Sequence, residues 1–231
     1  MLKICSFKSP PLIVMSTDGF RASYLRKNIT PAIERLIDCG THSKFMLPSF
    51  PSKTFPNHYA IATGLYPAWN GIVDNHFYDA DLPRQYFSPS VHDQGWYLGE
   101  PIWNTVQKYN MKSAVYFWPG GESPVNGNNC GTKPTIAMPY DSKVPFTQRI
   151  DKVIEWLNLA DDQRPSLIQV YIEQPDAAGH IGGPDSEVVK TAMITADAVV
   201  GYLTNRLLHE GLMGCVNLIL VSDHGLFTVT T

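Results

Sequence analysis

The chain has 231 residues, of which 44% are hydrophobic and 17% are charged, a composition typical of an ordinary globular domain. Its formal net charge of −3, without any cluster of basic residues interleaved with aromatics, argues against nucleic-acid binding through a basic surface. No apolar run approaches the ~20 residues that a membrane-spanning helix needs, and the first residues lack the long apolar core of a signal peptide.

The hydrophobic pattern predicts strands that alternate with helices, and hence a mostly parallel α/β sheet. In chain order the predicted elements are a strand at 11–17, a helix opened by Thr30-Pro31 and closed by Cys39-Gly40, a short helix at 57–63, a helix at 102–109, a strand at 112–117, a helix at 146–159, a strand at 166–172, a helix at 184–209 and a strand at 216–222. The Pro, Gly and Asn content of 119–145 predicts a long loop, and such loops are usually functional or mobile.

Three of the predicted strands end in residues that can bind a metal. The first ends at Asp18, the third is followed by Asp176 and His180, and the last is followed by Asp223-His224. Each of these alone is more often a turn or capping element. Ligand sites in parallel α/β sheets lie beyond the carboxyl ends of the strands, so three such termini together predict a metal site there. A pair of metal ions ~3.5–4 Å apart suits phosphoryl transfer.

A candidate nucleophile lies in the segment 51–59. Thr54 precedes the helix predicted at 57–63, and the N-terminal amides of a helix favour an anionic phosphate. The alternative interpretation is that Thr54 is only an N-cap residue.

Seven motifs, in order along the chain, resemble those of the ectonucleotide pyrophosphatase/phosphodiesterase family of the alkaline phosphatase superfamily. They are Thr17-Asp18-Gly19-Phe20-Arg21, Lys53-Thr54-Phe55-Pro56-Asn57-His58-Tyr59, Thr63-Gly64-Leu65-Tyr66-Pro67, Gly99-Glu100-Pro101-Ile102-Trp103, Phe117-Trp118-Pro119-Gly120, Pro175-Asp176-Ala177-Ala178-Gly179-His180 and Ser222-Asp223-His224-Gly225. The resemblance extends from about Pro11 over nearly the whole chain. It implies an alkaline phosphatase-like α/β core, with a mostly parallel sheet flanked by helices, and a single phosphodiesterase catalytic domain over 1–231.

The resemblance also implies two zinc ions and their ligands. One zinc would be held by Asp18, Thr54, Asp223 and His224, with Thr54 as the covalent nucleophile. The second would take Asp176, His180 and a further histidine that the family places downstream of the Asp-His-Gly motif, beyond Thr231. On this basis the domain is expected to be incomplete at its C-terminus and to hold nearer one zinc than two.

Further positions match the family's substrate contacts. Asn75 matches an amide donor to the phosphoryl oxygen, and Phe55 and Tyr140 match two aromatic rings that sandwich a nucleobase. The alternatives are a turn residue for Asn75 and core packing for the rings. Two more nucleotide contacts are matched by Lys53 and Trp118, whereas Glu122 stands where close relatives carry Asp. The loop over 122–145 favours nucleotides, because the lysophospholipid-cleaving branch of the family lacks most of it.

The implied function is the hydrolysis of nucleoside triphosphates or dinucleotides to nucleoside 5′-monophosphates through a covalent threonine intermediate. One alternative is a family phosphodiesterase that acts on choline or lysophospholipid diesters. The other alternative is a truncated, non-catalytic product that binds zinc or a nucleotide without turnover. Turnover of a chromogenic nucleotide diester would discriminate between an enzyme and a binding protein.

The cysteines are widely spaced and include no C-x-x-C pair, which argues against a zinc finger. The spacing of Cys5 and Cys215 is like that of a family disulfide, and the usual family partner of Cys39 would lie upstream of Met1. Cys130 has no family partner, and Asn28 begins a glycosylation sequon that Pro31 weakens. The resemblance implies an extracellular or cell-surface location, and family members are often membrane-anchored.

Overall fold

The core of the protein is a five-stranded parallel sheet, described by a computed structural model for residues 5, 7–93, 95–125 and 132–228. The strand order is β5-β4-β6-β1-β7, and each neighbouring pair is parallel, which confirms the predicted α/β class. The strands are β1 (Leu12–Thr17), β4 (Ser113–Tyr116), β5 (Ile136–Met138), β6 (Leu167–Ile172) and β7 (Asn217–Val221).

Strand β1 lies between β6 and β7 and contributes to a core on each face of the sheet. Alternate side chains of a strand point to opposite faces, so Ile13 and Met15 join one apolar core and Val14 joins the other. Because both faces are covered, the strands can be continuous apolar runs instead of alternating ones.

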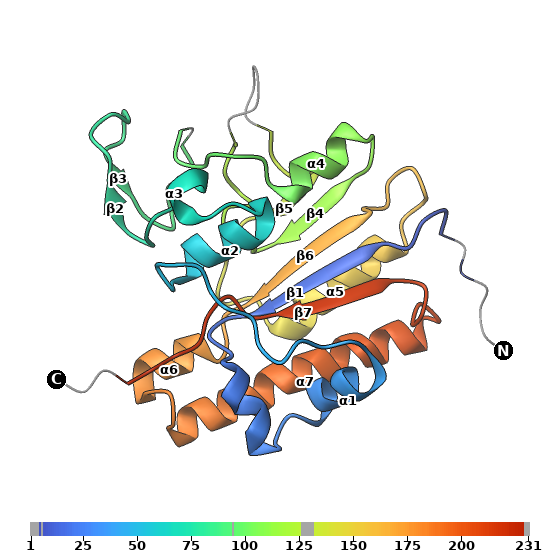
Figure 1. Ribbon diagram of the computed structural model, residues 1–231. Helices are drawn as coiled ribbons and strands as arrows, with labels where there is room; N and C mark the ends of the chain where they lie inside the picture. Colours follow the sequence, from blue (N-terminus) through green and yellow to red (C-terminus); the bar gives the residue numbers. More distant parts are fainter. Residues whose placement is uncertain (1–4, 6, 94, 126–131, 229–231) are drawn as a thin grey trace.

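Helices form a layer on each side of the sheet (Figure 1). One layer, which packs in the core with Ile13 and Met15, contains α1 (Pro31–Cys39), α5 (Phe146–Leu157) and α7 (Glu187–His209). The other layer contains α2 (Thr54–Thr63), α3 (Pro67–Asn70) and α4 (Ile102–Lys108). The remaining elements are the 3-10 helix η1 (Ala22–Lys27), the short helix α6 (Asp176–Gly182) and an antiparallel pair, β2 (Phe77–Tyr78) and β3 (Tyr86–Phe87).

Three elements differ from the prediction. Helix α2 begins at Thr54 and not at Asn57, because Pro56 occupies the first turn, where a missing N–H costs no helical hydrogen bond. Helix α7 begins after Ser186, which accepts a hydrogen bond from the Val189 amide, and α6 precedes it as a separate helix. Strand β5 lies inside the predicted long loop, because three residues are too few to give a hydrophobic period.

The cysteines support the pairing that the resemblance implies. Cys5 and Cys215 form a disulfide with their Cα atoms 5.3 Å apart, and Cys39 is an exposed free cysteine. Cys130 lies outside the described residues. Over the described ranges, the structure contains no helix that is long and apolar enough to cross a membrane.

The disulfide should contribute measurably to stability, because it links residues 210 positions apart and so restricts the unfolded chain. We expect Cys5→Ala to lower the free energy of unfolding by about 2–5 kcal/mol. The measurement is chemical denaturation under non-reducing conditions. The matched control is Cys39→Ala, which removes an exposed free thiol and should leave the midpoint unchanged. Equal midpoints for the two variants would contradict the prediction.

Candidate active site

The carboxyl ends of three strands meet at one edge of the sheet. Thr17, the last residue of β1, pairs with Ile172, the last residue of β6. Two backbone contacts then join the segments that follow the strands: the Asp176 amide donates to the Asp18 carbonyl oxygen at 3.0 Å, and the Gly19 amide donates to Asp223 Oδ1 at 3.1 Å. Asp18, Asp176 and Asp223, which follow the three strand ends, are therefore brought together.

Gly19 makes this close approach possible. Its φ of +68° lies in the left-handed region, and a Cβ at this position would come within 2.8 Å of the Asp176 Cβ. Gly225 has a similar role on the other side, because a Cβ there would come within 2.6 Å of the Arg21 Cβ. Any larger residue at either position would separate two segments that carry site residues.

His224 and Tyr171 both contact the carboxylates of the cluster formed by Asp18, Asp176 and Asp223. His224 Nε2 lies 3.4 Å from Asp18 Oδ1 and 3.1 Å from Asp223 Oδ2. The Tyr171 hydroxyl donates to Asp18 Oδ2 at 2.6 Å. One oxygen of Asp18 is thus held by Tyr171, and the other faces the cluster.

Three buried carboxylate oxygens in the cluster accept no hydrogen bond from the described residues: Asp18 Oδ1, Asp176 Oδ1 and Asp223 Oδ2. Buried polar atoms are nearly always satisfied, so these oxygens indicate a ligand. Two sets of side chains place one ligand atom each within 4.8 Å of one another: Asp18, Asp176 and His224, and Asp18, His58 and Asp223. The first set, with carboxylate donors and the imidazole of His224, fits a divalent metal ion, and Asp18 is common to both sets.

Burial dominates the electrostatics of the cluster. It raises the pKa of Asp18 well above the usual range, and the negative charges of Asp223 and Asp176 raise it further. Burial also raises the pKa of Asp223 to about 7, although the Gly19 amide opposes this shift. Burial lowers the pKa of His58 to about 3, so this imidazole is neutral at physiological pH. The site therefore favours a bound cation over free carboxylates.

Thr54 is the first residue of α2, and Asn75 holds the backbone of the next residue, Phe55. The Phe55 amide donates to Asn75 Oδ1 at 2.9 Å. A backbone N–H can only donate, so the side-chain atom of Asn75 that faces it must be the oxygen. The NH2 group of Asn75 is then free of this contact and can act as a donor. Asn75 is thus held beside the residue that follows Thr54, and its NH2 group is not used in that contact.

Asp176 and His180 lie one turn apart on α6. His180 Nε2 is 3.2 Å from Asp176 Oδ2, as the spacing of four residues predicts. The His180 side chain is 74% exposed, and it belongs to neither set of converging ligand atoms among the described residues. The structure therefore brings His180 to Asp176 but not to the centre of the cluster.

The predicted nucleotide contacts lie in different environments. Tyr140 is half-exposed, and its ring packs edge-on against Phe117 with centroids 5.1 Å apart. The Tyr140 amide donates to Glu122 Oε1 at 2.9 Å, so Glu122 holds the backbone beside this ring. Phe55 is partly buried against the second core, and Trp118 is 1% exposed. Trp118 donates its indole N–H to the His58 carbonyl oxygen. Its polar atom is therefore engaged within the protein.

Lys53 and Asn57 stabilise the segment around Thr54 through polar contacts. The Lys53 ammonium contacts both oxygens of Asp74, at 2.8 and 2.9 Å, on the surface. Asn57 accepts from the Ser49 amide and donates to the carbonyl oxygens of the preceding loop. Neither Asn57 nor His58 was singled out from the sequence. Their positions three and four residues after Thr54 were the available signal, because such residues share a helix face with it.

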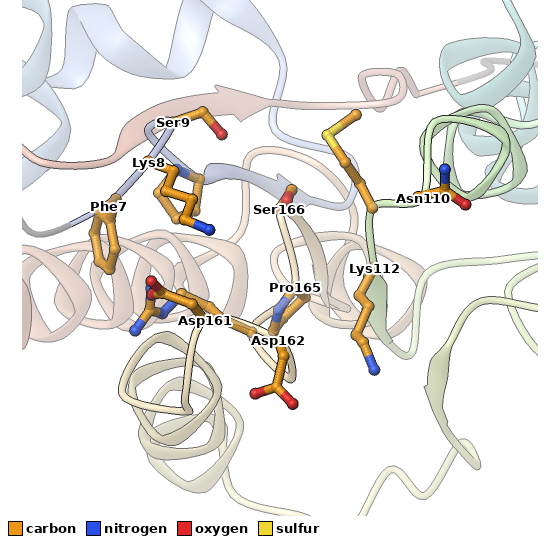
Figure 2. A pocket seen from close by; sticks show the side chains of 12 residues that line it. Phe7, Lys8, Ser9, Asn110, Lys112, Asp161, Asp162, Pro165 and Ser166 are labelled. Carbon is orange, nitrogen blue, oxygen red and sulfur yellow. The ribbon is translucent and has the colours of Figure 1, made fainter.

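A separate cavity of about 220 Å³ lies at the opposite edge of the sheet, where β1, β4 and β6 begin (Figure 2). Its charged lining includes Lys8, Lys112 and Asp162, and Asp161, which pairs with Arg164 at 2.5 Å. None of the converging ligand sets among the described residues involves this lining. The candidate active site is therefore the carboxyl edge and not this cavity.

Comparison with known proteins identifies similar chains. The family model for type I phosphodiesterase / nucleotide pyrophosphatase matches residues 12–231. Venom phosphodiesterase CdcPDE from Crotalus durissus collilineatus is 44% identical over 224 residues, which cover 95% of this chain and 26% of that protein. Ectonucleotide pyrophosphatase/phosphodiesterase family member 1 from Homo sapiens is 44% identical over 224 residues, with 95% and 24% covered. The chain spans about a quarter of the length of these curated relatives.

A solved structure gives the same picture of the fold. The inactive form of murine ectonucleotide pyrophosphatase / phosphodiesterase 5, in complex with AMP, superposes with a TM-score of 0.89 at 33% identity. The superposition covers 96% of this chain and 59% of that chain. This similarity confirms the alkaline phosphatase-like core that the sequence motifs imply.

The raised carboxyl pKa values predict how the metal-free chain responds to pH. Around pH 7 the native Asp223 retains part of a proton that the unfolded carboxyl has lost, so unfolding releases protons and stability falls as pH rises; the raised pKa of Asp18 acts in the same direction. We expect the Asp223 carboxyl to account for a loss on the order of 1 kcal/mol between pH 6.5 and 8. Below this window His58, with its lowered pKa, contributes the opposite slope.

The measurement is denaturation in the presence of a chelator across this pH window. Asp223→Asn should flatten the slope because one titrating group is removed, whereas Asp162→Asn, at the opposite edge, should not. A wild-type stability that rises between pH 6.5 and 8 would show that these carboxyls are not protonated in the native state.

Proposed function

Because this chain belongs to the type I phosphodiesterase / nucleotide pyrophosphatase family, we propose that its carboxyl edge is the catalytic centre of a zinc-dependent enzyme that hydrolyses nucleoside triphosphates or dinucleotides to nucleoside 5′-monophosphates. One observation carries the proposal: His58 Nδ1, on the helix that begins with Thr54, lies 2.9 Å from the Thr54 carbonyl oxygen and 3.3 Å from Asp223 Oδ2 in the carboxylate cluster. Residues 1–231 form a single catalytic domain in this proposal, whose C-terminal boundary would lie beyond this chain.

The mixed donor set is the basis for proposing zinc. Carboxylate and imidazole groups are usual zinc ligands, and the buried oxygens without a described hydrogen-bond donor need a cation. The first ion would be held by Asp18, Thr54, Asp223 and His224, and the second by Asp176 and His180 with a further histidine. When bound, zinc supplies positive charge that favours an ionised hydroxyl and neutralises the phosphoryl oxygens.

Thr54 would act as the nucleophile. Its oxygen forms a bond to phosphorus, its proton passes to solvent, and the bond from phosphorus to the leaving oxygen breaks. Water then cleaves the threonyl ester, which releases the nucleoside 5′-monophosphate and returns the hydroxyl proton to Thr54. The place of Thr54 at the start of α2 supports this role, because the first amides of a helix favour negative charge.

Asn75 would stabilise the charge that develops on the phosphoryl oxygen. Its Oδ1 is engaged by the Phe55 amide, so the side chain is oriented before substrate binds. An oriented amide donor is most effective when it needs no reorganisation during the reaction. The contact to Phe55 therefore supports both the orientation of Asn75 and its closeness to the nucleophile.

The nucleobase would stack on Phe55 and Tyr140, and Lys53 and Trp118 would form the sides of the nucleotide site. Glu122 supports the position of Tyr140 through the backbone hydrogen bond. The AMP bound to the murine relative is consistent with a nucleotide substrate. Trp118 would contribute chiefly by supporting α2, because its ring is buried.

An extracellular or cell-surface location fits the disulfide and the relatives. Disulfides persist in oxidising compartments, and the similar proteins are venom and ecto-enzymes by name. Asn28 is exposed and would be the glycosylated residue of the Asn28-Ile29-Thr30 sequon.

The nucleophile proposal predicts a specific pattern of activities. Thr54→Ala should lower turnover of a chromogenic nucleotide diester by at least about a thousandfold, as expected when a covalent nucleophile is lost. Thr54→Ser should retain measurable turnover because the hydroxyl survives. The assay uses the longest natural polypeptide that contains residues 1–231, loaded with zinc. Thr63→Ala, at the other end of α2, is the control, and a Thr54→Ala activity within tenfold of wild type would exclude this role.

The stacking proposal predicts a change in substrate preference. Phe55→Ala and Tyr140→Ala should weaken kcat/KM for nucleotide diesters more than for a small aryl diester, because each ring contributes about 1–3 kcal/mol of stacking to a base. The observable is the ratio of the two specificity constants. Tyr109→Ala, which removes a 73% exposed ring on the α4 side, is the control. An unchanged ratio in both site variants would mean that the rings are structural.

A further inference from the structure

His58 is a completely buried polar residue that the proposed reaction does not use directly. It lies on α2, one turn after Thr54, and its ring packs edge-on between Trp118 and Tyr171, with centroids 5.0 Å from each. Both nitrogens of the ring are engaged. Nε2 is 2.8 Å from Ser16 Oγ, and Nδ1 is 2.9 Å from the Thr54 carbonyl oxygen.

These partners determine which nitrogen carries the hydrogen. A carbonyl oxygen can only accept, so the His58 hydrogen must be on Nδ1, where it points to Thr54. Nε2 is then an acceptor, and the Ser16 hydroxyl must donate to it. Ser16 is itself fully buried on β1, two residues before Asp18. The Thr54 carbonyl therefore selects the tautomer of His58, and the Ser16 hydroxyl satisfies the remaining nitrogen.

The same Nδ1–H group also faces a ligand of the metal cluster. Asp223 Oδ2 lies 3.3 Å from His58 Nδ1 and accepts no hydrogen bond from a described residue. A single N–H group thus lies between the backbone of the proposed nucleophile and a carboxylate that follows β7. The Trp118 indole N–H donates to the His58 carbonyl oxygen at 3.1 Å and so holds the backbone of His58.

We infer that His58 is a positioning residue, which fixes Thr54 relative to Asp223 through Nδ1–H in the tautomer set by the Thr54 carbonyl. This inference rests on the proposed function, because it takes Thr54 as the nucleophile and Asp223 as a metal ligand. His58 does not touch the substrate in this role. It acts by holding α2 and the end of β7 at a constant separation, as residues behind metal ligands commonly do.

Two substitutions separate this role from simple core packing. His58→Asn keeps an amide nitrogen on Cγ, where Nδ1 is attached, and can still donate to Thr54 while facing Asp223. His58→Gln places its amide where Nε2 was and can reach only Ser16. Both variants lose part of the ring volume, so both should be destabilised to a similar degree. A purely structural histidine would give equal effects on the site.

The first measurement is zinc affinity of the full 231-residue chain below its unfolding midpoint. We expect His58→Gln and His58→Ala to lose about 10–100-fold in zinc affinity, whereas His58→Asn stays within about threefold of wild type. In the longest natural polypeptide, kcat for a nucleotide diester should follow the same order with little change in KM. Equal losses for the Asn and Gln variants would overturn the inference.

The second measurement needs no variant at position 58. Nitrogen-15 NMR of the metal-free wild-type chain should show His58 with a protonated Nδ1 and an unprotonated Nε2. Ser16→Ala should keep the Nδ1–H tautomer, because the Thr54 carbonyl can only accept, and Ser113→Ala, another buried strand serine, should keep it as well. An Nε2–H tautomer in the wild type would overturn the inference. Ordered zinc affinities without any nucleotide turnover would instead refute the proposed function alone.

Discussion

Buried carboxylates repel one another, and three of them meet where β1, β6 and β7 end. The parallel register puts Asp18, Asp176 and Asp223 at one edge, and desolvation makes their free ionised forms unfavourable there. Two contacts relieve part of this conflict, because the Tyr171 hydroxyl donates to Asp18 and the Gly19 amide donates to Asp223, but one oxygen of each carboxylate accepts no hydrogen bond from the described residues. A cation at this edge would remove the repulsion, so the fold and the proposed chemistry depend on the same charge balance.

The sequence was a good guide to the elements whose pattern is local. Strands β1, β6 and β7 are continuous apolar runs, and because parallel strands end at a common edge, the hydrophobic pattern alone was enough to place Asp18, Asp176 and Asp223-His224 together. Motif resemblance added Asn75 and the ligand role of Thr54, which the pattern did not provide. The predicted start of α2, at residue 57, was wrong. Proline usually interrupts a helix, but Pro56 lies in the first turn of α2, where proline is tolerated.

What the sequence did not reveal is how polar side chains pair across distant segments. His58 meets Ser16 over 42 positions, and Tyr171 meets Asp18 over 153, so neither contact leaves a periodic signal. Glu122 is a similar case: the substitution relative to the family was visible, but its hydrogen bond to the Tyr140 backbone depends on how the long loop folds back. Hydrogen-bond partners of this kind require tertiary structure, since composition and spacing do not encode them.

The close approach at Gly19 and Gly225 bears on how relatives of this chain should be judged. Both glycines are contact surfaces between segments that carry site residues, with hypothetical Cβ atoms 2.8 and 2.6 Å from their neighbours. A paralogue could retain every carboxylate and histidine and still have its ligands forced apart by one methyl group at either position. A comparison based only on the ligand residues would then classify an inactive protein as an active enzyme. Gly19 and Gly225 should therefore be compared together with the neighbouring site residues when a relative is judged to have kept or lost its activity.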